Sequence, residues 1–266
     1  MMKYTYPDGE DRLTREWFDG AGEEFKRYSE VSDHRVMEKL NGWLQGHTGG
    51  QASLLDAGCG EGRLILELAA GFHRVEAVEP DAARIDRAKA KVRLAGLEDK
   101  VTFNCGTIEQ IAPTARFDAV VCSHVLQHVH TASVPTLLRR LREALFDGGQ
   151  LVLTTCHSTT GQESFDQTLN QGGQLIVEPV SKEQFDALIY NQESILPCRY
   201  FTELELTALV VAAGFEIRQV WLFHVDVQSF HELGGAEDID DRINADPQLR
   251  ARMGVDVLIL AEARAG

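Results

Sequence analysis

The sequence lacks the features that mark secreted and membrane-spanning proteins. Its five cysteines are an odd number without a C-x-x-C pair, which argues against both a disulfide framework and a zinc site. No apolar run approaches the roughly 20 residues that a helix needs to cross a bilayer. The chain begins Met1-Met-Lys-Tyr-Thr-Tyr-Pro, without an apolar signal segment. We therefore expect a protein of the reducing cytoplasm that makes no membrane contact.

Positive charge is also scarce. The 266 residues contain 41 Asp and Glu against 26 Lys and Arg, a formal net charge of −15 at pH 7. A chain this acidic repels a polyanion at long range, and no stripe of Lys and Arg offsets the repulsion locally. Nucleic acid is therefore not expected as a partner. The length suffices to bury a substantial core, as in one α/β domain with additions, and no internal repeat is present.

The most informative feature that is present is a glycine-rich turn after a buried strand. Residues 54–62 read Leu-Leu-Asp-Ala-Gly-Cys-Gly-Glu-Gly, and residues 63–70 then have helical spacing up to Gly71. A strand, a tight glycine turn and a helix N-terminus form a cradle for a nucleotide-like ligand, because glycine lets the backbone approach closely. Arg63 stands where a dinucleotide fingerprint would have its third glycine. For this loop by itself, a glycine turn that binds nothing is the alternative.

A second short strand follows and ends in an acid. Residues 74–79 read Arg-Val-Glu-Ala-Val-Glu, and Pro80-Asp81 then opens a helix. A carboxylate at the tip of the second strand of a βαβ unit can accept hydrogen bonds from both ribose hydroxyls. Glu79 lies about 20 residues beyond the loop, as that geometry requires. For Glu79 alone, a solvated acid at a strand end is the alternative.

Together with three later segments, these motifs resemble the class I S-adenosylmethionine-dependent methyltransferases. The later segments are residues 101–109, 117–128 and 145–153, which read VTFNCGTIE, FDAVVCSHVLQH and LFDGGQLVL. The resemblance covers roughly residues 50–222, with a last strand at 255–262. It implies an α/β fold with a doubly wound, mostly parallel sheet of seven strands. The last strand is antiparallel, helices cover both faces, and S-adenosylmethionine is the methyl donor.

The first half of the expected single methyltransferase domain consists of a cap and a core. Residues 1–50 form an N-terminal helical cap, with helices expected over 14–28 and 31–44. Residues 51–154 form the cofactor-binding core. After its first two strands, the core is expected to contain strands at 101–104, 117–122 and 150–154 and a helix at 135–145.

The second half contains two insertions. Residues 155–200 would supply the acceptor pocket or a lid, and the candidate walls of that pocket are Phe165, Phe185, Tyr190 and Tyr200. In the last segment, 201–266, a capping box at Thr202 starts a helix that ends at Gly214, and strands follow. An acidic interruption at 224–253 is long enough to be a lid, a binding segment or a homo-oligomer contact.

By position, the resemblance implies which residues hold the cofactor. Asp56 and the backbone of Gly58, Cys59 and Gly60 would hold the methionine moiety, and Glu79, followed by Pro80, would hold the ribose.

The other end of the cofactor would meet residues 106–108, with an apolar side chain, Ile108, on the adenine ring. An aspartate commonly accepts from the adenine amino group in this family, but this chain has Thr107. A threonine hydroxyl forms a weaker hydrogen bond, because the bond is not charge-assisted. Ser123 would line the methyl-transfer cavity. Tyr28 would cap the amino-acid end of the cofactor with its amphipathic phenol.

Four histidines follow the fourth and fifth strands, at the edge where ligands bind in open α/β sheets: His124, His128, His130 and His157. Histidine can remove a proton near neutral pH, so we assign His124 and His128 as candidate catalytic bases. For each histidine, packing or lining the cavity is the alternative. We assign no metal ligands, because no carboxylate lies in the same segment as these histidines.

The hypothesis that follows is methyl transfer to a small-molecule acceptor. Since the sulfonium of the cofactor is already activated, alignment of the nucleophile with the methyl group can suffice, with a histidine base where the acceptor must lose a proton. A tRNA-modifying methyltransferase is one alternative, because related catalytic domains share the late helix and strand. A non-catalytic cofactor-binding partner subunit is another. No residue pattern indicates which atom is methylated.

Overall fold

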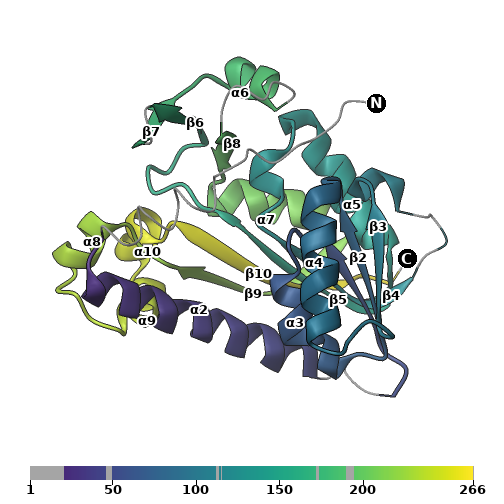
Figure 1. The fold of residues 1–266 in the computed structure, drawn as a ribbon. Coiled ribbons are helices and arrows are strands. Elements are labelled where there is room, and N and C mark those ends of the chain that lie inside the picture. Colours follow the sequence, from purple (N-terminus) through teal and green to yellow (C-terminus); the bar gives the residue numbers. More distant parts are fainter. Residues whose placement is uncertain are drawn as a thin grey trace.

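A computed structural model describes residues 21–45, 50–111, 114, 116–171, 174–189 and 195–265 (Figure 1). Its central sheet consists of β1 (Ser53–Ala57), β2 (Arg74–Glu79), β3 (Val101–Cys105), β4 (Phe117–Ser123), β5 (Leu145–Cys156), β9 (Phe215–Phe223) and β10 (Asp256–Ala263). The strand order is β3-β2-β1-β4-β5-β10-β9. β1 to β5 pair in parallel, whereas β10 is antiparallel to both β5 and β9. The predicted seven-stranded, doubly wound sheet with an antiparallel last strand is confirmed.

Helices cover both faces of this sheet. On one face lie α2 (Glu23–Leu44), α3 (Arg63–Leu68) and α4 (Ala82–Leu94), and on the other lie α5 (Val134–Glu143) and α7 (Glu203–Ala212). α5 shows how sequence produces this layer: Leu137, Leu138 and Leu141 form its buried stripe, while its arginines stay on the outer side. In the part of the chain that the structure describes, no helix is both long and apolar enough to span a membrane.

The helical cap differs from its prediction. One continuous helix, α2, replaces the two helices predicted over 14–28 and 31–44, and residues 14–20 lie outside the described part. No glycine or proline interrupts residues 28–31. The buried positions Phe25, Tyr28, Ser32, Val36 and Leu40 also recur at helical spacing across the expected break.

The start of β5 also differs from its prediction. The helix predicted to reach residue 145 ends at Glu143, and β5 begins at Leu145 instead of Gln150. Leu145 pairs with Phe117 of β4, so strand pairing overrides the helical periodicity that includes Leu145.

The first insertion has a small sheet of its own over the carboxyl edge of the main sheet (Figure 1). Its strands β6 (Ser164–Gln171), β7 (Gln174–Pro179) and β8 (Ile195–Tyr200) are antiparallel in the order β7-β6-β8, and α6 (Lys182–Leu188) packs beside them. The ring centroids of Phe165 and Phe185 lie 5.0 Å apart in the core of this insertion. Because Phe185 is fully buried, it supports the insertion and does not line a pocket, contrary to our expectation. Tyr190 lies outside the described residues.

The second insertion is helical. Residues 224–253, the acidic interruption of the sequence, form α8 (Val227–Glu232), α9 (Ile239–Ala245) and α10 (Pro247–Met253). Asp226 and Asp246 cap two of these helices with their carboxylates, a signal that is readable in the sequence. Phe230, Ile239 and Ile243 are fully buried in one of the two apolar clusters, so this insertion is part of the core.

Candidate active site

The glycine loop turns its backbone donors toward the protein. Gly58, Gly60 and Gly62 all have positive φ, which glycine adopts freely. The N–H groups of Gly58 and Cys59 donate to the carbonyl oxygen of Val78, at 2.8 and 3.0 Å, and the Gly60 N–H donates to Oε2 of Glu79 at 3.1 Å. These donors are therefore not directed at a ligand, as they would be in a phosphate-binding loop.

Asp56, near the carboxyl end of β1, has a carboxylate oxygen that accepts no hydrogen bond within the described residues. Its side chain is 2 % exposed, and its Oδ2 has no hydrogen-bond partner among the described residues. The pKa of Asp56 is raised to about 7, mainly by burial; Arg63 opposes this rise, and the neighbouring Glu79 adds to it. A buried carboxylate without a partner suits a positively charged ligand group, such as the amino group of a methionine moiety.

Glu79 joins the loop to the following helix. Its Oε2 accepts from Gly60, and its Oε1 accepts from the Asp81 N–H at 3.1 Å. Burial raises the pKa of this carboxyl. Each carboxylate oxygen has a second lone pair, so Glu79 can still accept from two ribose hydroxyls. The half-buried Pro80 follows directly.

The segment expected to contact adenine forms hydrogen bonds within itself. Thr107 caps η3 (Ile108–Gln110): its hydroxyl accepts from the Gln110 N–H, while its N–H donates to Oε1 of Gln110 at 2.9 Å. Ile108 is buried in the apolar cluster that includes Val78. The adenine roles of Thr107 and Ile108 stay predictions, and local capping already occupies one lone pair of the Thr107 hydroxyl.

Two further predicted cofactor residues have partners within the protein. Ser123, at the end of β4, shares a hydrogen bond of 2.8 Å with the hydroxyl of Thr154. Tyr28 is 1 % exposed, and its phenol donates to Oδ1 of Asp240 at 2.7 Å. The phenol therefore connects α2 with α9, and a cofactor contact for either side chain stays a prediction.

The two candidate bases differ in the nitrogen that carries the proton. Nδ1 of His128 lies 3.0 Å from the carbonyl oxygen of Pro197. A carbonyl only accepts, so Nδ1 carries the hydrogen and Nε2 has the lone pair. Burial lowers the pKa of His128 to about 4, so the ring is neutral at pH 7.

His124 has the opposite arrangement. Its Nδ1 lies 3.1 Å from Nε2 of Gln127, whose Oε1 accepts from Thr155 at 2.9 Å. The amide nitrogen therefore faces the ring, Nδ1 accepts, and the proton is on Nε2. The other two histidines serve the backbone. His157 hydrogen-bonds the carbonyl oxygen of Gly254, and His130 accepts from a backbone N–H.

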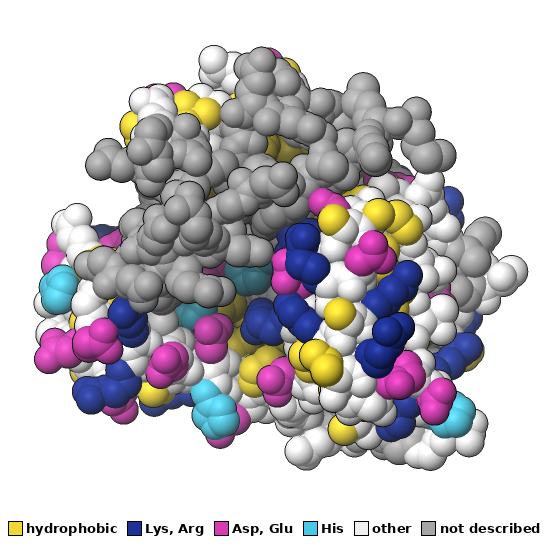
Figure 2. Space-filling model, in the orientation of Figure 1, with side chains coloured by type: hydrophobic (Ala, Val, Ile, Leu, Met, Phe, Trp, Pro, Cys, Tyr) yellow, Lys and Arg dark blue, Asp and Glu magenta, His cyan; other side chains and the backbone are white. Residues whose placement is uncertain are grey.

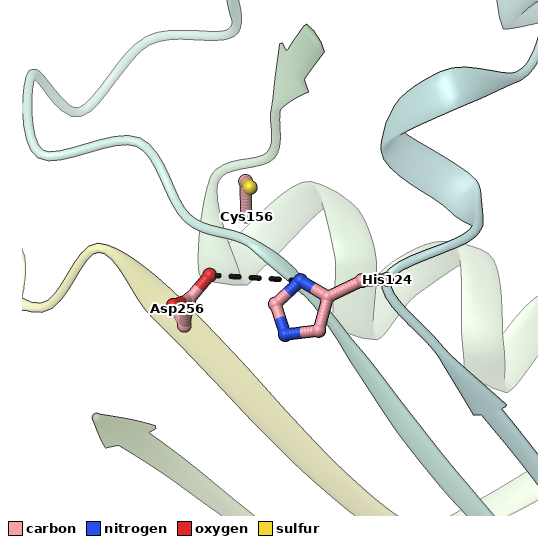
Figure 3. Close-up of side chains that lie close together, drawn as sticks. All are labelled: His124, Cys156 and Asp256. Carbon is pink, nitrogen blue, oxygen red and sulfur yellow. Dashed lines mark ion pairs between the residues drawn. The ribbon is translucent and has the colours of Figure 1, made fainter. Parts of the chain in front are cut away.

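The tertiary structure adds three residues that sequence reasoning missed. Asp256 begins β10 directly opposite Cys156 of β5, and its Oδ1 lies 3.9 Å from Nδ1 of His124 (Figure 3). His224, just after β9, approaches Asp256 with its Nδ1 3.0 Å from Oδ2. Burial disfavours the imidazolium, but the Asp256 carboxylate raises the pKa of His224 above its usual value. The sequence offered one signal for this arrangement, the expected antiparallel pairing of the last strand, which brings residue 256 near residue 156.

A family model described as "Methyltransferase domain" matches residues 25–220, most of the chain. Malonyl-[acyl-carrier protein] O-methyltransferase of Priestia megaterium is 25 % identical over 154 residues, which cover 57 % of this chain and 54 % of that protein. Ubiquinone biosynthesis O-methyltransferase of Bradyrhizobium sp. (strain ORS 278) is 33 % identical over 102 residues, 38 % of this chain and 39 % of that protein. The chain thus spans about half the length, or less, of these curated relatives.

Solved structures show the same fold. An S-adenosylmethionine-dependent methyltransferase from Mesorhizobium loti matches with a TM-score of 0.56 and 20 % identity, over 85 % of this chain and 96 % of that one. The 1,6-didemethyltoxoflavin-N1-methyltransferase of Burkholderia thailandensis, with S-adenosylhomocysteine bound, matches with a TM-score of 0.55 and 18 % identity, over 98 % and 92 %. These names agree with S-adenosylmethionine as the expected methyl donor. With a family match over most of its length, the chain belongs to the methyltransferase-domain family, and its fold is that of the S-adenosylmethionine-dependent methyltransferases described above.

Proposed function

We propose that this chain transfers the methyl group of S-adenosylmethionine to an oxygen atom of a small-molecule acceptor, with His128 as the base. The observation that carries the proposal is the direction of the polar groups at the glycine loop. The N–H groups of Gly58, Cys59 and Gly60 are bound to β2, while Asp56 presents a free buried carboxylate oxygen. Such a site favours a cation over a phosphate. The names of the two curated relatives, both O-methyltransferases, support oxygen as the methylated atom.

Contact between the loop and the segment after β4 supports the positioning of donor and acceptor. A Cβ atom on Gly58 would lie 2.3 Å from Cγ2 of Val125, so the loop packs against the segment that contains both candidate bases. Bound S-adenosylmethionine supplies a methyl group that is already activated by its sulfonium. Asp56 and Glu79 would orient the cofactor. Nε2 of His128 would accept the proton of the acceptor hydroxyl as its oxygen is methylated.

The attachment of the first insertion to the main sheet supports its proposed role as a cover over a small acceptor. Its β8 accepts the His128 hydrogen bond at Pro197, and its Asp186 accepts two hydrogen bonds of 2.7 Å from Thr131. The insertion is thus fastened at two points to the segment that follows β4.

The charge distribution supports a small acceptor only in part. Contrary to our reading of the sequence, Lys and Arg do gather over α4 (Figure 2). Two of them, Arg87 and Lys91, both pair with Glu61, at 2.6 and 2.7 Å. A tRNA substrate would need free cations, and this pairing neutralises two of those on α4.

Two experiments test the proposal. Calorimetric titration with S-adenosylmethionine should show saturable binding, and incubation of a metabolite extract with methyl-labelled cofactor should label a small molecule. His128→Gln should then lower the labelling rate by roughly 100-fold or more without changing cofactor affinity, because a positioned base contributes about 10²–10⁴-fold. His73→Gln is the matched control and should keep the rate, because His73 is an exposed histidine directly before β2. Label in tRNA alone would overturn the choice of acceptor, and cofactor binding without any transfer would favour a non-catalytic subunit.

A further inference from the structure

Three different metal-ligating side chains meet at the carboxyl edge of the sheet. His124, Cys156 and Asp256 each offer one ligand atom, and these atoms all lie within 4.8 Å of one another. Figure 3 shows the imidazole and the carboxylate facing each other, with the thiol of Cys156 close to both. Three atoms at such distances lie within about 2.8 Å of a common point. Bonds to Zn²⁺ measure about 2.0–2.3 Å, so each ligand needs to move by roughly half an ångström.

The backbone holds this arrangement. Asp256 and Cys156 are direct partners in the antiparallel ladder of β10 and β5, so their side chains lie on the same face of the sheet. The N–H of His124 donates to the carbonyl oxygen of Thr154 at 2.9 Å, which ties the residue after β4 to β5. The three ligands thus come from three adjacent strands.

The tautomer of His124 and the partner of Asp256 also suit a cation. Nδ1 of His124, the atom nearest Asp256, has its lone pair available, and a bound ion would replace the Gln127 amide as its partner. His224 donates to Oδ2 of Asp256, which leaves Oδ1 for the ion. A second contact of this kind orients a ligating carboxylate in metal sites.

Both histidines that flank Asp256 have an uncommon backbone conformation. His124 (φ 52°) and His224 (φ 54°) are the two non-glycine residues with positive φ among those that the structure describes. Left-handed backbone costs about 1–2 kcal/mol for such residues. Two such residues beside one carboxylate indicate that the position of these rings matters to the protein.

We propose that His124, Cys156 and Asp256 bind one divalent transition-metal ion, with Zn²⁺ as the best match, and leave a coordination position open for the acceptor oxygen. The donor set selects the ion: thiolate and imidazole suit Zn²⁺, whereas Mg²⁺ and Ca²⁺ prefer oxygen ligands alone. A thiolate and a carboxylate balance the two positive charges of the ion. Three protein ligands and an open position are typical of catalytic zinc sites.

The catalytic use of this ion rests on the proposed function, whereas its binding does not. Val125, the residue after His124, touches the glycine loop, so the ion would lie close to the methyl donor. An acceptor hydroxyl bound to the ion loses its proton more readily. His128 would then receive that proton at Nε2. The ion therefore assists the base and does not replace it.

Binding of Co²⁺ tests the site without cofactor or acceptor. The full chain is freed of metal with a chelator and titrated with Co²⁺, followed by visible and near-ultraviolet absorption. We expect saturation at one equivalent, visible bands typical of low-symmetry Co²⁺, and a thiolate-to-cobalt charge-transfer band that Zn²⁺ abolishes by displacement. His124→Ala and Asp256→Asn should raise the Kd at least about 10-fold, as even outer contacts of metal ligands do.

Cys156→Ser is the decisive variant, and Cys105→Ser is its matched control because Cys105 is an exposed thiol on β3. Cys156→Ser should lose the charge-transfer band, and Cys105→Ser should keep it. No saturable Co²⁺ binding in the wild type, or a band that survives Cys156→Ser, overturns the proposal. Calorimetry with S-adenosylmethionine on the metal-free protein tests the proposed function separately. Cofactor binding without Co²⁺ binding would remove the metal site alone, and the reverse result would remove the cofactor site alone.

Discussion

Tyr28 and Asp240, 212 residues apart in the sequence, are joined by a buried hydrogen bond of 2.7 Å from the phenol to Oδ1. Ser32 donates to the other oxygen, so α2 and α9 share this carboxylate. Tyr28→Phe removes one of its two donors. We expect the free energy of unfolding, measured by urea denaturation, to fall by about 1.5–3 kcal/mol, as for hydrogen bonds to charged groups.

The same variant separates a structural from a cofactor role of Tyr28. If the phenol serves only Asp240, Tyr28→Phe binds S-adenosylmethionine with unchanged Kd. A raised Kd in a folded variant would instead support the predicted contact with the cofactor. Asp241→Asn is the control for stability, because the Asp241 carboxyl is exposed and its replacement should change stability by less than about 0.5 kcal/mol.

Glu79 is expected to carry a large part of the cofactor affinity. Glu79→Gln replaces one acceptor oxygen by a donor and so cannot serve both ribose hydroxyls and both backbone N–H groups. We expect the Kd for S-adenosylmethionine to rise roughly 10- to 150-fold, the equivalent of about 1.5–3 kcal/mol. Glu76→Gln changes a half-buried acid on the same strand and should leave the Kd unchanged. Equal Kd values for the two variants would contradict the assignment of Glu79.

Gly58 is constrained by space as well as by backbone conformation. Its φ is +87°, and an added Cβ would lie 2.3 Å from Val125. Gly58→Ala should therefore weaken cofactor binding and stability together. Val125→Ala in the same chain should recover part of the stability, because it removes the clash but not the unfavourable φ.

Gly96→Ala provides the comparison for the backbone effect. Gly96 also has positive φ, at +66°, but no atom lies within 4 Å of the added Cβ. We expect a loss of about 1 kcal/mol from conformation alone, with unchanged cofactor affinity. If Gly58→Ala costs no more than Gly96→Ala, the contact with Val125 does not matter.

Asp56 should make stability depend on pH in an unusual direction. Its pKa is about 7 in the folded protein, against about 3.9 in an unfolded chain. Between these two pH values, the folded protein binds more protons than the unfolded chain. The contribution of Asp56 to the free energy of unfolding therefore falls as pH rises, and it levels off above pH 7. Asp56→Asn, compared with the wild type, should therefore be about 2 kcal/mol more stabilising near pH 8 than near pH 5.

The pH dependence of cofactor binding provides a second measurement of the ionisation of Asp56. A cationic cofactor group favours ionised Asp56, so S-adenosylmethionine should bind the wild type more tightly as pH rises through about 7. That trend should weaken in Asp56→Asn. If the variant changes the free energy of unfolding equally at both pH values, folding does not raise the pKa of Asp56, which contradicts a carboxyl buried without a partner.

The cofactor half of the site could be predicted because it is local in sequence. The glycine loop and Glu79 belong to one βαβ unit, and their spacing determines where they lie. The direction of the loop N–H groups could not be predicted, because it depends on Val78 and Glu79 accepting them. The sequence analysis divided α2 into two helices. No residue at 28–31 breaks a helix, so the local sequence permits one continuous helix, and packing on the sheet stabilises its full length.

By itself, the sequence determined the strand and helix alternation, the glycine turn and the acid that follows it, because local spacing and backbone preference decide these features. Only the tertiary structure decided that Cys156, His124, Asp256 and His224 share one edge of the sheet. They come from four segments, and the strand order β4-β5-β10-β9 brings them together. Strand order depends on long-range pairing and burial, which no local pattern records. The carboxylate that the histidine segment lacks is therefore supplied by the last strand of the sheet.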